Sequence, residues 1–193
     1  MGNGTFTRGN LEIIHFDNVW IPHLKEIIKT HKNGPWNCLE IGSWEGRSAC
    51  FLMEELPDSR LTCIDTFKGS IEHVNEDTEN VYKRFMKNTE PYKDRITVIQ
   101  SDSFSALKKL EDRYDYIFID GSHEYNDVVY DALLAWKLVK PGGVFIFDDF
   151  RVFPCVDKAI SVFESLFASE IQQVYNAYDQ RIYIASNNIT GST

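Results

Sequence analysis

Short apolar segments alternate along the chain with segments whose apolar residues recur at helical spacing. Five of the apolar segments are expected to form strands, at residues 36–41, 61–64, 96–99, 116–119 and 144–147. Continuous apolar strands that alternate with helices are typical of a parallel sheet covered on both faces. Two more strands, at 171–176 and 181–185, flank a short turn and predict an antiparallel pair. The pattern therefore predicts a doubly wound α/β sheet of seven strands with an antiparallel C-terminal hairpin.

The helices between these strands are predicted from apolar residues three and four positions apart. One helix is expected to bury Val129, Ala132, Leu133 and Trp136, and another is anchored by Val81, Tyr82, Phe85 and Met86. The segment Pro141-Gly142-Gly143 is expected to turn the chain into the fifth strand. The whole chain, 1–193, is expected to be a single domain with a core at 36–186 and loose ends at 1–10 and 187–193.

Composition narrows the classes of partner. The 193-residue chain has a net charge of -9, which argues against DNA or RNA because phosphate binding needs a basic face. No apolar stretch approaches the ~20 residues of a membrane span. The four cysteines show no paired spacing and are expected to be free thiols. We expect a cytoplasmic protein that binds a small molecule and neither nucleic acid nor membrane, and we allow for a homodimer.

Acidic residues follow almost every predicted strand. The apolar segments end at Glu40, Asp65, Asp102, Asp120 and the pair Asp148-Asp149. In open α/β sheets the ligand lies beyond the carboxyl ends of the strands, beside the first strand. Carboxylates gathered there favour a cationic or polyhydroxylated ligand.

The loop after the first strand predicts one half of this ligand site. Gly42 and Gly46 leave room for a close approach of the backbone, and the helix that is expected to start near Trp44 offers free N–H groups to an anion. Ser43 and Ser48 add hydroxyl donors or cap that helix. The site suits an amino-acid zwitterion attached to a nucleoside, with its ammonium group near Glu40.

The later strand ends predict the other half of the ligand site. Asp65, next to Thr66, can accept both hydroxyls of a ribose, and Asp102 can read an adenine amino group between Ser101 and Ser103. The alternatives are helix caps, at Asp65 and at Asp102 for a helix that begins near Phe104. Trp44 and Phe67 either line the cleft or pack beneath it.

These residues together resemble the class I S-adenosylmethionine (SAM)-dependent methyltransferases, a Rossmann-like family. The resemblance covers 36–185 and rests on the Glu40-x-Gly42-x-x-x-Gly46 loop, Asp65, Ser101-Asp102 and the segment 138–143. The segments 120–125 and 147–149 are similar to the macrocin and sugar O-methyltransferase branch, and more distantly to catechol O-methyltransferase. The resemblance implies SAM as cofactor, with Asp120 also near it, and Mg²⁺ bound by acidic residues at the fourth and fifth strand ends.

The predicted metal ligands are Asp120, Asp148 and Asp149. Carboxylates that leave neighbouring strands repel each other, and a hard divalent cation such as Mg²⁺ relieves that repulsion. The alternative is that one of them points to solvent and another caps Arg151 or a backbone N–H group.

The predicted catalytic residues are His123 and Asp120. His123 is a candidate base because a neutral imidazole can accept a hydroxyl proton, although a surface histidine is the simpler interpretation without the resemblance. The sequence thus predicts Mg²⁺-dependent O-methylation of a sugar or catechol-like small molecule. The rival interpretations are a metal-independent methyltransferase, a nicotinamide-dependent reductase and a non-catalytic interaction protein.

Overall fold

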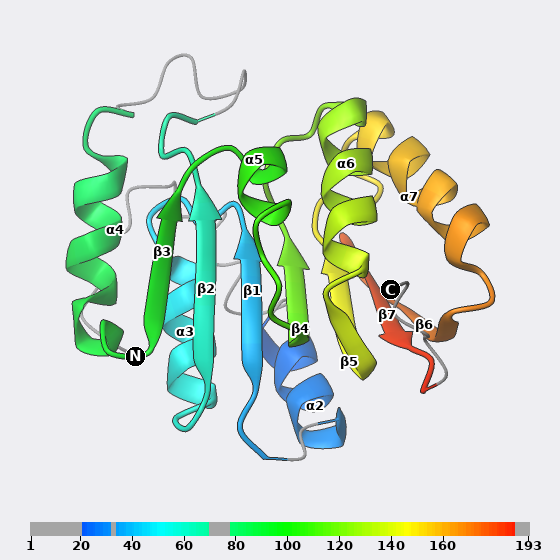
Figure 1. Cartoon of the computed structure of the whole chain (residues 1–193), viewed down its shortest axis with the longest axis horizontal. Helices are drawn as coiled ribbons and strands as arrows, with labels where there is room; N and C mark the ends of the chain where they lie inside the picture. Colours follow the sequence, from blue (N-terminus) through cyan, green and yellow to red (C-terminus); the bar gives the residue numbers. More distant parts are fainter. Residues whose placement is uncertain (1–20, 32–33, 70–77, 188–193) are drawn as a thin grey trace.

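A computed structural model describes residues 21–31, 34–69 and 78–187 and shows a single seven-stranded sheet between helical layers (Figure 1). The strands are β1 (Asn37–Ile41), β2 (Arg60–Asp65), β3 (Ile96–Gln100), β4 (Tyr114–Ile119), β5 (Val139–Phe147), β6 (Ile171–Ala177) and β7 (Gln180–Ala185). All seven predicted strands are confirmed. Of the predicted loose ends, 1–10 and 188–193 lie outside the described residues.

The strand order is β3-β2-β1-β4-β5-β7-β6, with β1 to β5 parallel and β7 antiparallel to both of its neighbours. The predicted doubly wound sheet with an antiparallel hairpin is therefore correct. The chain leaves β1 toward β2 on one side and later returns to place β4 on the other side. Beyond β1 and β4 lies the switch point where α/β sheets bind ligands.

Helices cover both faces of the sheet. They are α2 (Ile21–His31), α3 (Arg47–Glu55), α4 (Val81–Thr89), α5 (Ser103–Leu107), α6 (Tyr125–Trp136) and α7 (Pro154–Phe167), with a short 3-10 turn at Glu90–Tyr92. In Figure 1, α5, α6 and α7 lie on the near face, α2 and α3 lie behind the sheet, and α4 stands beside the β3 edge. Successive strand residues point to opposite faces, so each strand contributes to two apolar layers.

The buried face of α6 differs from the prediction by about one residue. Ala132 and Trp136 are buried as expected, but Val129 and Leu133 are only half-buried. Val128 and Asp131 point inward in their place. The prediction counted only apolar residues as buried. Because Asp131 is a buried polar residue, the prediction placed the buried face of α6 incorrectly.

Two smaller expectations also need correction. Tyr82 and Met86 in α4 are 37% and 42% exposed, so Val81 and Phe85 anchor this helix without them. The segment 141–143 was expected to form a turn before the fifth strand, but it lies inside β5. The register of β5 against β4 shifts there, from Tyr114↔Val139 to Tyr116↔Val144. β5 has more residues than β4 across this register shift, and the irregularity accommodates the proline and the two glycines within the strand.

Two further predictions concern the cysteines and the membrane. The four cysteines are free thiols, as expected. Within the described parts of the chain, no helix combines the length and the apolar character that a membrane span requires.

Candidate functional site at the carboxyl ends of the strands

The loop after β1 is held by the carboxylate that ends β2. The N–H groups of Ser43 and Trp44 each donate to Asp65 Oδ2 at 2.7 Å, and the N–H of Phe67 donates to Oδ1 at 2.6 Å. Trp44 and Phe67 both have positive φ, a conformation that such bonds help to hold. The N–H groups expected to face an anion at Ser43 and Trp44 therefore face Asp65, and α3 begins later, at Arg47.

The two loop glycines meet protein rather than open space. A Cβ on Gly42 would lie 1.9 Å from the Asp120 carbonyl oxygen, so this glycine allows the loop to touch the end of β4. A Cβ on Gly46 would lie 2.9 Å from Thr89 Cγ2 and 3.0 Å from the Phe85 ring. The space beside these two glycines, which was expected to admit a ligand, is thus filled by other segments of the protein. At Gly42 this close approach brings the ends of β1 and β4 together.

Glu40 is a buried acid at the end of β1. It is 2% exposed, and its Oε2 accepts from the Ser43 hydroxyl at 2.5 Å and from the Cys63 thiol at 3.5 Å. Burial raises the pKa of the Glu40 carboxyl above its usual range, and hydrogen bonds from Ser43 and Ser48 oppose that shift. The predicted role of Glu40 toward a cationic group stays a prediction.

The segment after β3 joins the same edge. Ser101 donates its backbone N–H to the Asp65 carbonyl at 3.1 Å. Asp102 caps α5 by accepting the Ser105 N–H at 2.8 Å, so the helix-cap alternative is realised. One Asp102 oxygen makes this bond, and the side chain remains exposed to a ligand. Ser103 hydrogen-bonds the buried Asp131, a residue that the sequence analysis did not select.

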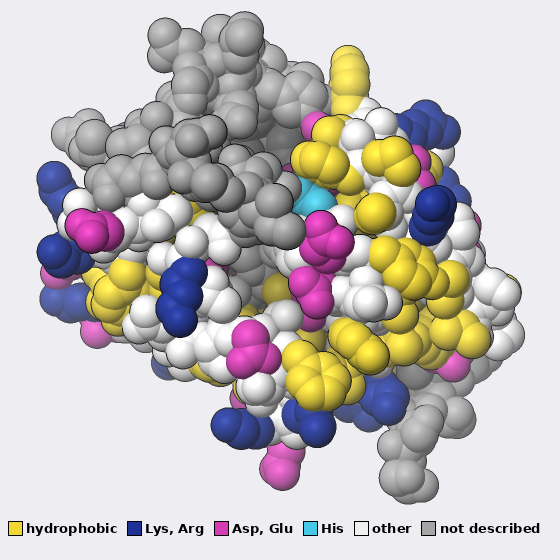
Figure 2. Space-filling view, turned by 90° about the horizontal axis from the view of Figure 1, so that it is seen from above, with side chains coloured by type: hydrophobic (Ala, Val, Ile, Leu, Met, Phe, Trp, Pro, Cys, Tyr) yellow, Lys and Arg dark blue, Asp and Glu magenta, His cyan; other side chains and the backbone are white. Residues whose placement is uncertain are grey.

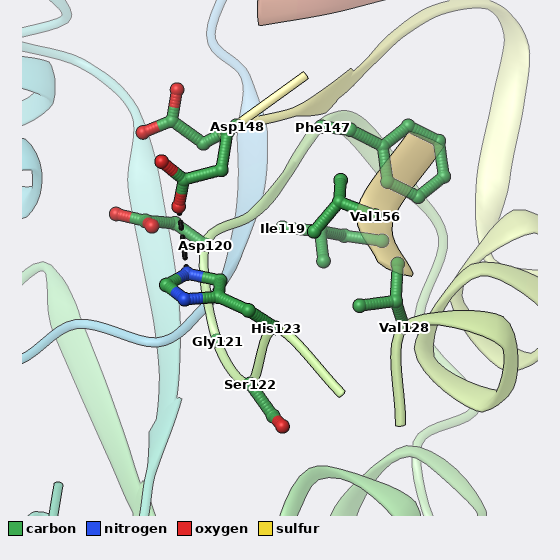
Figure 3. Close-up of a pocket in the computed structure, with 10 residues that line it drawn as sticks. Ile119, Asp120, Gly121, Ser122, His123, Val128, Phe147, Asp148 and Val156 are labelled. Carbon is green, nitrogen blue, oxygen red and sulfur yellow. Dashed lines mark ion pairs between the residues drawn. The ribbon is translucent and has the colours of Figure 1, made fainter. Parts of the chain in front are cut away.

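A compact polar cluster lies at the ends of β4 and β5. Ligand atoms of Asp120, His123 and Asp149 all lie within 4.8 Å of one another. His123 Nε2 is 2.7 Å from Asp149 Oδ2. The dashed line at His123 in Figure 3 marks this contact. Asp148 lies outside this compact set and accepts the buried Gln180 amide at 3.1 Å. The structure thus gathers two of the three predicted metal ligands with the predicted base.

The imidazole of His123 is held on a second side by an aromatic ring. It stacks on Phe153, with ring centroids 4.2 Å apart and an interplanar angle of 16°. Phe153 stands just before α7, and nothing in its sequence context pointed to this contact. Behind the histidine the pocket is apolar, lined by Ile119, Val128, Phe147 and Val156 (Figure 3).

The view from above in Figure 2 shows acidic side chains and a histidine gathered near the middle of this face, bordered by hydrophobic side chains. The donor set in the compact cluster is two carboxylates and one imidazole nitrogen. Carboxylates suit Mg²⁺ and Mn²⁺, and imidazole suits transition metals such as zinc and iron. The residues therefore fit a divalent cation.

Comparison with known proteins agrees with this geometry. The sequence model of a family described as "Methyltransferase domain" matches residues 39–150, more than half of the chain. The chain belongs to this methyltransferase family. An uncharacterised protein of Acanthamoeba polyphaga mimivirus is 28% identical over 149 residues, which are 72% of this chain. The chain covers 65% of the length of that relative.

Solved methyltransferases share the fold. The O-methyltransferase NovP is 18% identical with a TM-score of 0.68, over 90% of this chain and 80% of its own. The mycinamycin-pathway methyltransferase MycE, in complex with Mg and SAH, is 19% identical with a TM-score of 0.63, over 89% of this chain and 51% of its own. The predicted methyltransferase family and the predicted Rossmann-like fold are confirmed.

Proposed function

We propose that this methyltransferase transfers the methyl group of SAM to a hydroxyl oxygen of a small molecule, of the sugar or catechol class. The observation that carries the proposal is the cluster of Asp120, His123 and Asp149 beside the loop that follows β1. The backbone of that loop touches Asp120 at Gly42, so a base and the predicted cofactor loop share one edge of the sheet.

The cofactor is assigned to the residues predicted from sequence. Glu40 would receive the ammonium group of the amino-acid end, with Gly42, Ser43, Trp44, Gly46 and Ser48 around it. Asp65 accepts three N–H groups, and a carboxylate has about four acceptor positions, which leaves room for a ribose hydroxyl beside Thr66. The exposed Asp102, between Ser101 and Ser103, would meet the adenine. The buried, oriented Glu40 is the feature of this structure that fits a cationic cofactor.

The protein does not have to activate the methyl group, because SAM supplies it in an activated form. The protein has to hold the acceptor hydroxyl in line and remove its proton. We assign this proton transfer to His123, and the assignment is supported by the contacts that its ring makes with Asp149 and Phe153. A proton taken by the imidazole would be stabilised by the Asp149 carboxylate 2.7 Å away.

A divalent cation held by Asp120 and Asp149, with Asp148 as the third predicted ligand, would lower the pKa of a bound hydroxyl. The complex of MycE with Mg and SAH supports this assignment on a similar fold. The Mg²⁺ requirement, like the cytoplasmic location and the homodimer, stays a prediction.

A second candidate is metal-independent methylation. The contact between His123 and Asp149 is the arrangement of a base and the group that orients it, and such a pair can deprotonate a hydroxyl without a metal. The two candidates share the cofactor and the class of substrate. They differ in whether excess chelator stops the reaction.

The first experiment is a thermal-shift measurement with SAM, SAH and NAD(H), each with and without Mg²⁺ and Mn²⁺. A ligand that binds only the folded state raises the melting temperature, and by more at higher concentration. We expect SAM and SAH to stabilise the protein and NAD(H) to leave it unchanged. Stabilisation by NAD(H) alone would favour a reductase, and a protein that none of these ligands stabilises would favour a non-catalytic role.

A further inference from the structure

Helix α4 is joined to the loop after β1 by a partly buried ion pair. The Arg84 Nε lies 2.5 Å from Glu45 Oε1, and the two side chains are 20% and 3% exposed. On the same helix, Asn88 donates its amide to the Glu45 carbonyl at 3.0 Å. Glu45 therefore turns away from the predicted ligand and toward α4. An ion pair this buried is costly to break from one side, because the remaining charge is left without compensation.

Apolar contacts reinforce the same connection. The space that a side chain on Gly46 would occupy is filled by Phe85 and Thr89 of α4. The Phe67 ring packs against Tyr82 and Phe85, with centroids 5.0 and 5.1 Å apart. Phe67 belongs to the turn after β2, which Asp65 bonds to the first loop. One helix thus contacts both segments that flank the predicted cofactor site.

We propose that Arg84 is a positioning residue for the cofactor, acting through Glu45 to hold the loop after β1 in its binding shape. This inference rests on the proposed function. It adds that α4, a helix from outside the glycine loop and the strand ends, sets the affinity for the amino-acid end of the cofactor. That end is assigned to the braced loop, whereas the adenine is assigned to the segment after β3.

Because the loop is assigned to the amino-acid end, a change in the loop should affect a ligand that carries this end more than one that lacks it. SAH carries the amino-acid end, and methylthioadenosine has the same nucleoside without it. If Arg84 only contributed to general stability, its loss would weaken both ligands to the same degree. If it positions the loop, SAH should lose affinity while methylthioadenosine is nearly unaffected.

The test compares Arg84→Gln with Lys87→Gln, a matched loss of one positive charge at an exposed position of the same helix. We expect Arg84→Gln to weaken SAH by at least about tenfold and methylthioadenosine by less than about threefold, measured by calorimetry or competition. Lys87→Gln should change both by less than about twofold. Arg84→Lys, which keeps the charge but loses the planar donor, should recover part of the SAH affinity.

Three results would overturn the inference: wild-type SAH affinity in Arg84→Gln, equal weakening of both ligands, or equal effects of Arg84→Gln and Lys87→Gln.

If Arg84→Gln does not fold, hydrogen exchange measured on the wild-type protein, with and without SAH, takes the place of the binding test. SAH should then slow exchange in α4 as well as in residues 43–47, and protection confined to the loop would contradict the coupling. A wild-type protein that does not bind SAH would instead refute the proposed function.

Discussion

At the scale of single residues, Asp65 joins the fold to the predicted ligand site. Its carboxylate accepts three backbone N–H groups from two separate loops. The sequence predicts that the same carboxylate binds a ribose, and this role stays a prediction. If Asp65 also binds the ribose, a change at this residue should alter binding and stability together.

Replacing Asp65 with alanine should weaken SAH by more than tenfold, about 1.5–3 kcal/mol, because charged hydrogen bonds to the ligand and to the loop are lost. The melting temperature should also fall. Calorimetry and thermal unfolding check both effects. Asp58→Ala, in an exposed turn, is the control. Wild-type affinity in Asp65→Ala would exclude this residue from the cofactor site.

Asp131 predicts an unusual dependence of stability on pH. It is 2% exposed, and burial raises the pKa of its carboxyl from 3.8 to about 7, although a hydrogen bond from Ser103 opposes the shift. Between these two values the folded state holds a proton that the unfolded state has lost, so the free energy of unfolding falls as the pH rises.

Asp131→Asn should remove this dependence, because an amide does not ionise. The variant should be more stable than the wild type at pH 8, by roughly 2–4 kcal/mol, and the gain should vanish near pH 4. Urea unfolding at several pH values measures it, with Asp58→Asn in an exposed turn as control. If Asp131→Asn raised the free energy of unfolding by the same amount at every pH, that result would contradict the raised pKa.

His123 is the residue on which the proposed chemistry depends. His123→Ala should lower kcat by ~10²–10⁴-fold and leave SAH affinity nearly unchanged, because the histidine is assigned to the acceptor proton. Steady-state kinetics on an acceptor found among sugars and catechols, together with SAH titration, separates the two effects. A loss smaller than about threefold would reduce His123 to a loop residue.

At the scale of elements, the contact between the ends of β1 and β4 decides the shape of the site. Gly42 has a φ of 85°, and its missing side chain leaves room for the Asp120 carbonyl. The same contact brings the loop after β1 next to the residue that begins the polar cluster. The geometry of the site therefore depends on how closely two neighbouring strand ends approach.

Gly42→Ala should abolish folding or cost well over ~3 kcal/mol, because a Cβ would overlap the Asp120 carbonyl and strain the backbone. Gly34→Ala is the matched control, since its φ of 99° is also positive but no described atom lies within 4 Å of its Cβ position. There only the strain of about 1–2 kcal/mol applies. Similar unfolding free energies for both variants would show that the overlap is relieved by movement.

At the scale of the whole molecule, the polar cluster forms only when two strands and the loops after them are assembled. Asp120 and His123 follow β4, and Asp149 follows β5. Asp149 also has a φ of 59°, which turns its carboxylate toward the histidine. The cluster is thus a property of the assembled sheet edge, where β4 and β5 are neighbours.

Methyl transfer should stop in excess chelator and return when Mg²⁺ or Mn²⁺ is added. Asp149→Asn should reduce turnover more than Asp148→Asn, because Asp149 lies in the compact cluster and Asp148 is bonded to Gln180. SAH affinity should be nearly the same in both variants. Full turnover in excess chelator would favour the metal-independent candidate, with His123 and Asp149 acting as a pair.

The sequence by itself determined the strands, the doubly wound parallel sheet with its antiparallel hairpin, and the position of each acidic residue at a strand end. These features follow from local patterns, because apolar runs mark buried strands and the residue after a run marks the edge of the sheet. Together with the glycine loop, they carried the resemblance to the methyltransferases, and that resemblance predicted the class. Glu40, Asp65 and Asp120 lie at that edge as predicted.

Only the tertiary structure decided where those side chains point and what they bind. Glu45 pairs with Arg84, 39 residues later, and Asp148 bonds Gln180, 32 residues later. Such partners are set by which elements the fold packs together and by positive φ at positions such as Asp149. Neither cause produces a periodic pattern in the sequence. The ion pair of Arg84 with Glu45 and the contact of His123 with Asp149 could therefore be found only in the three-dimensional structure.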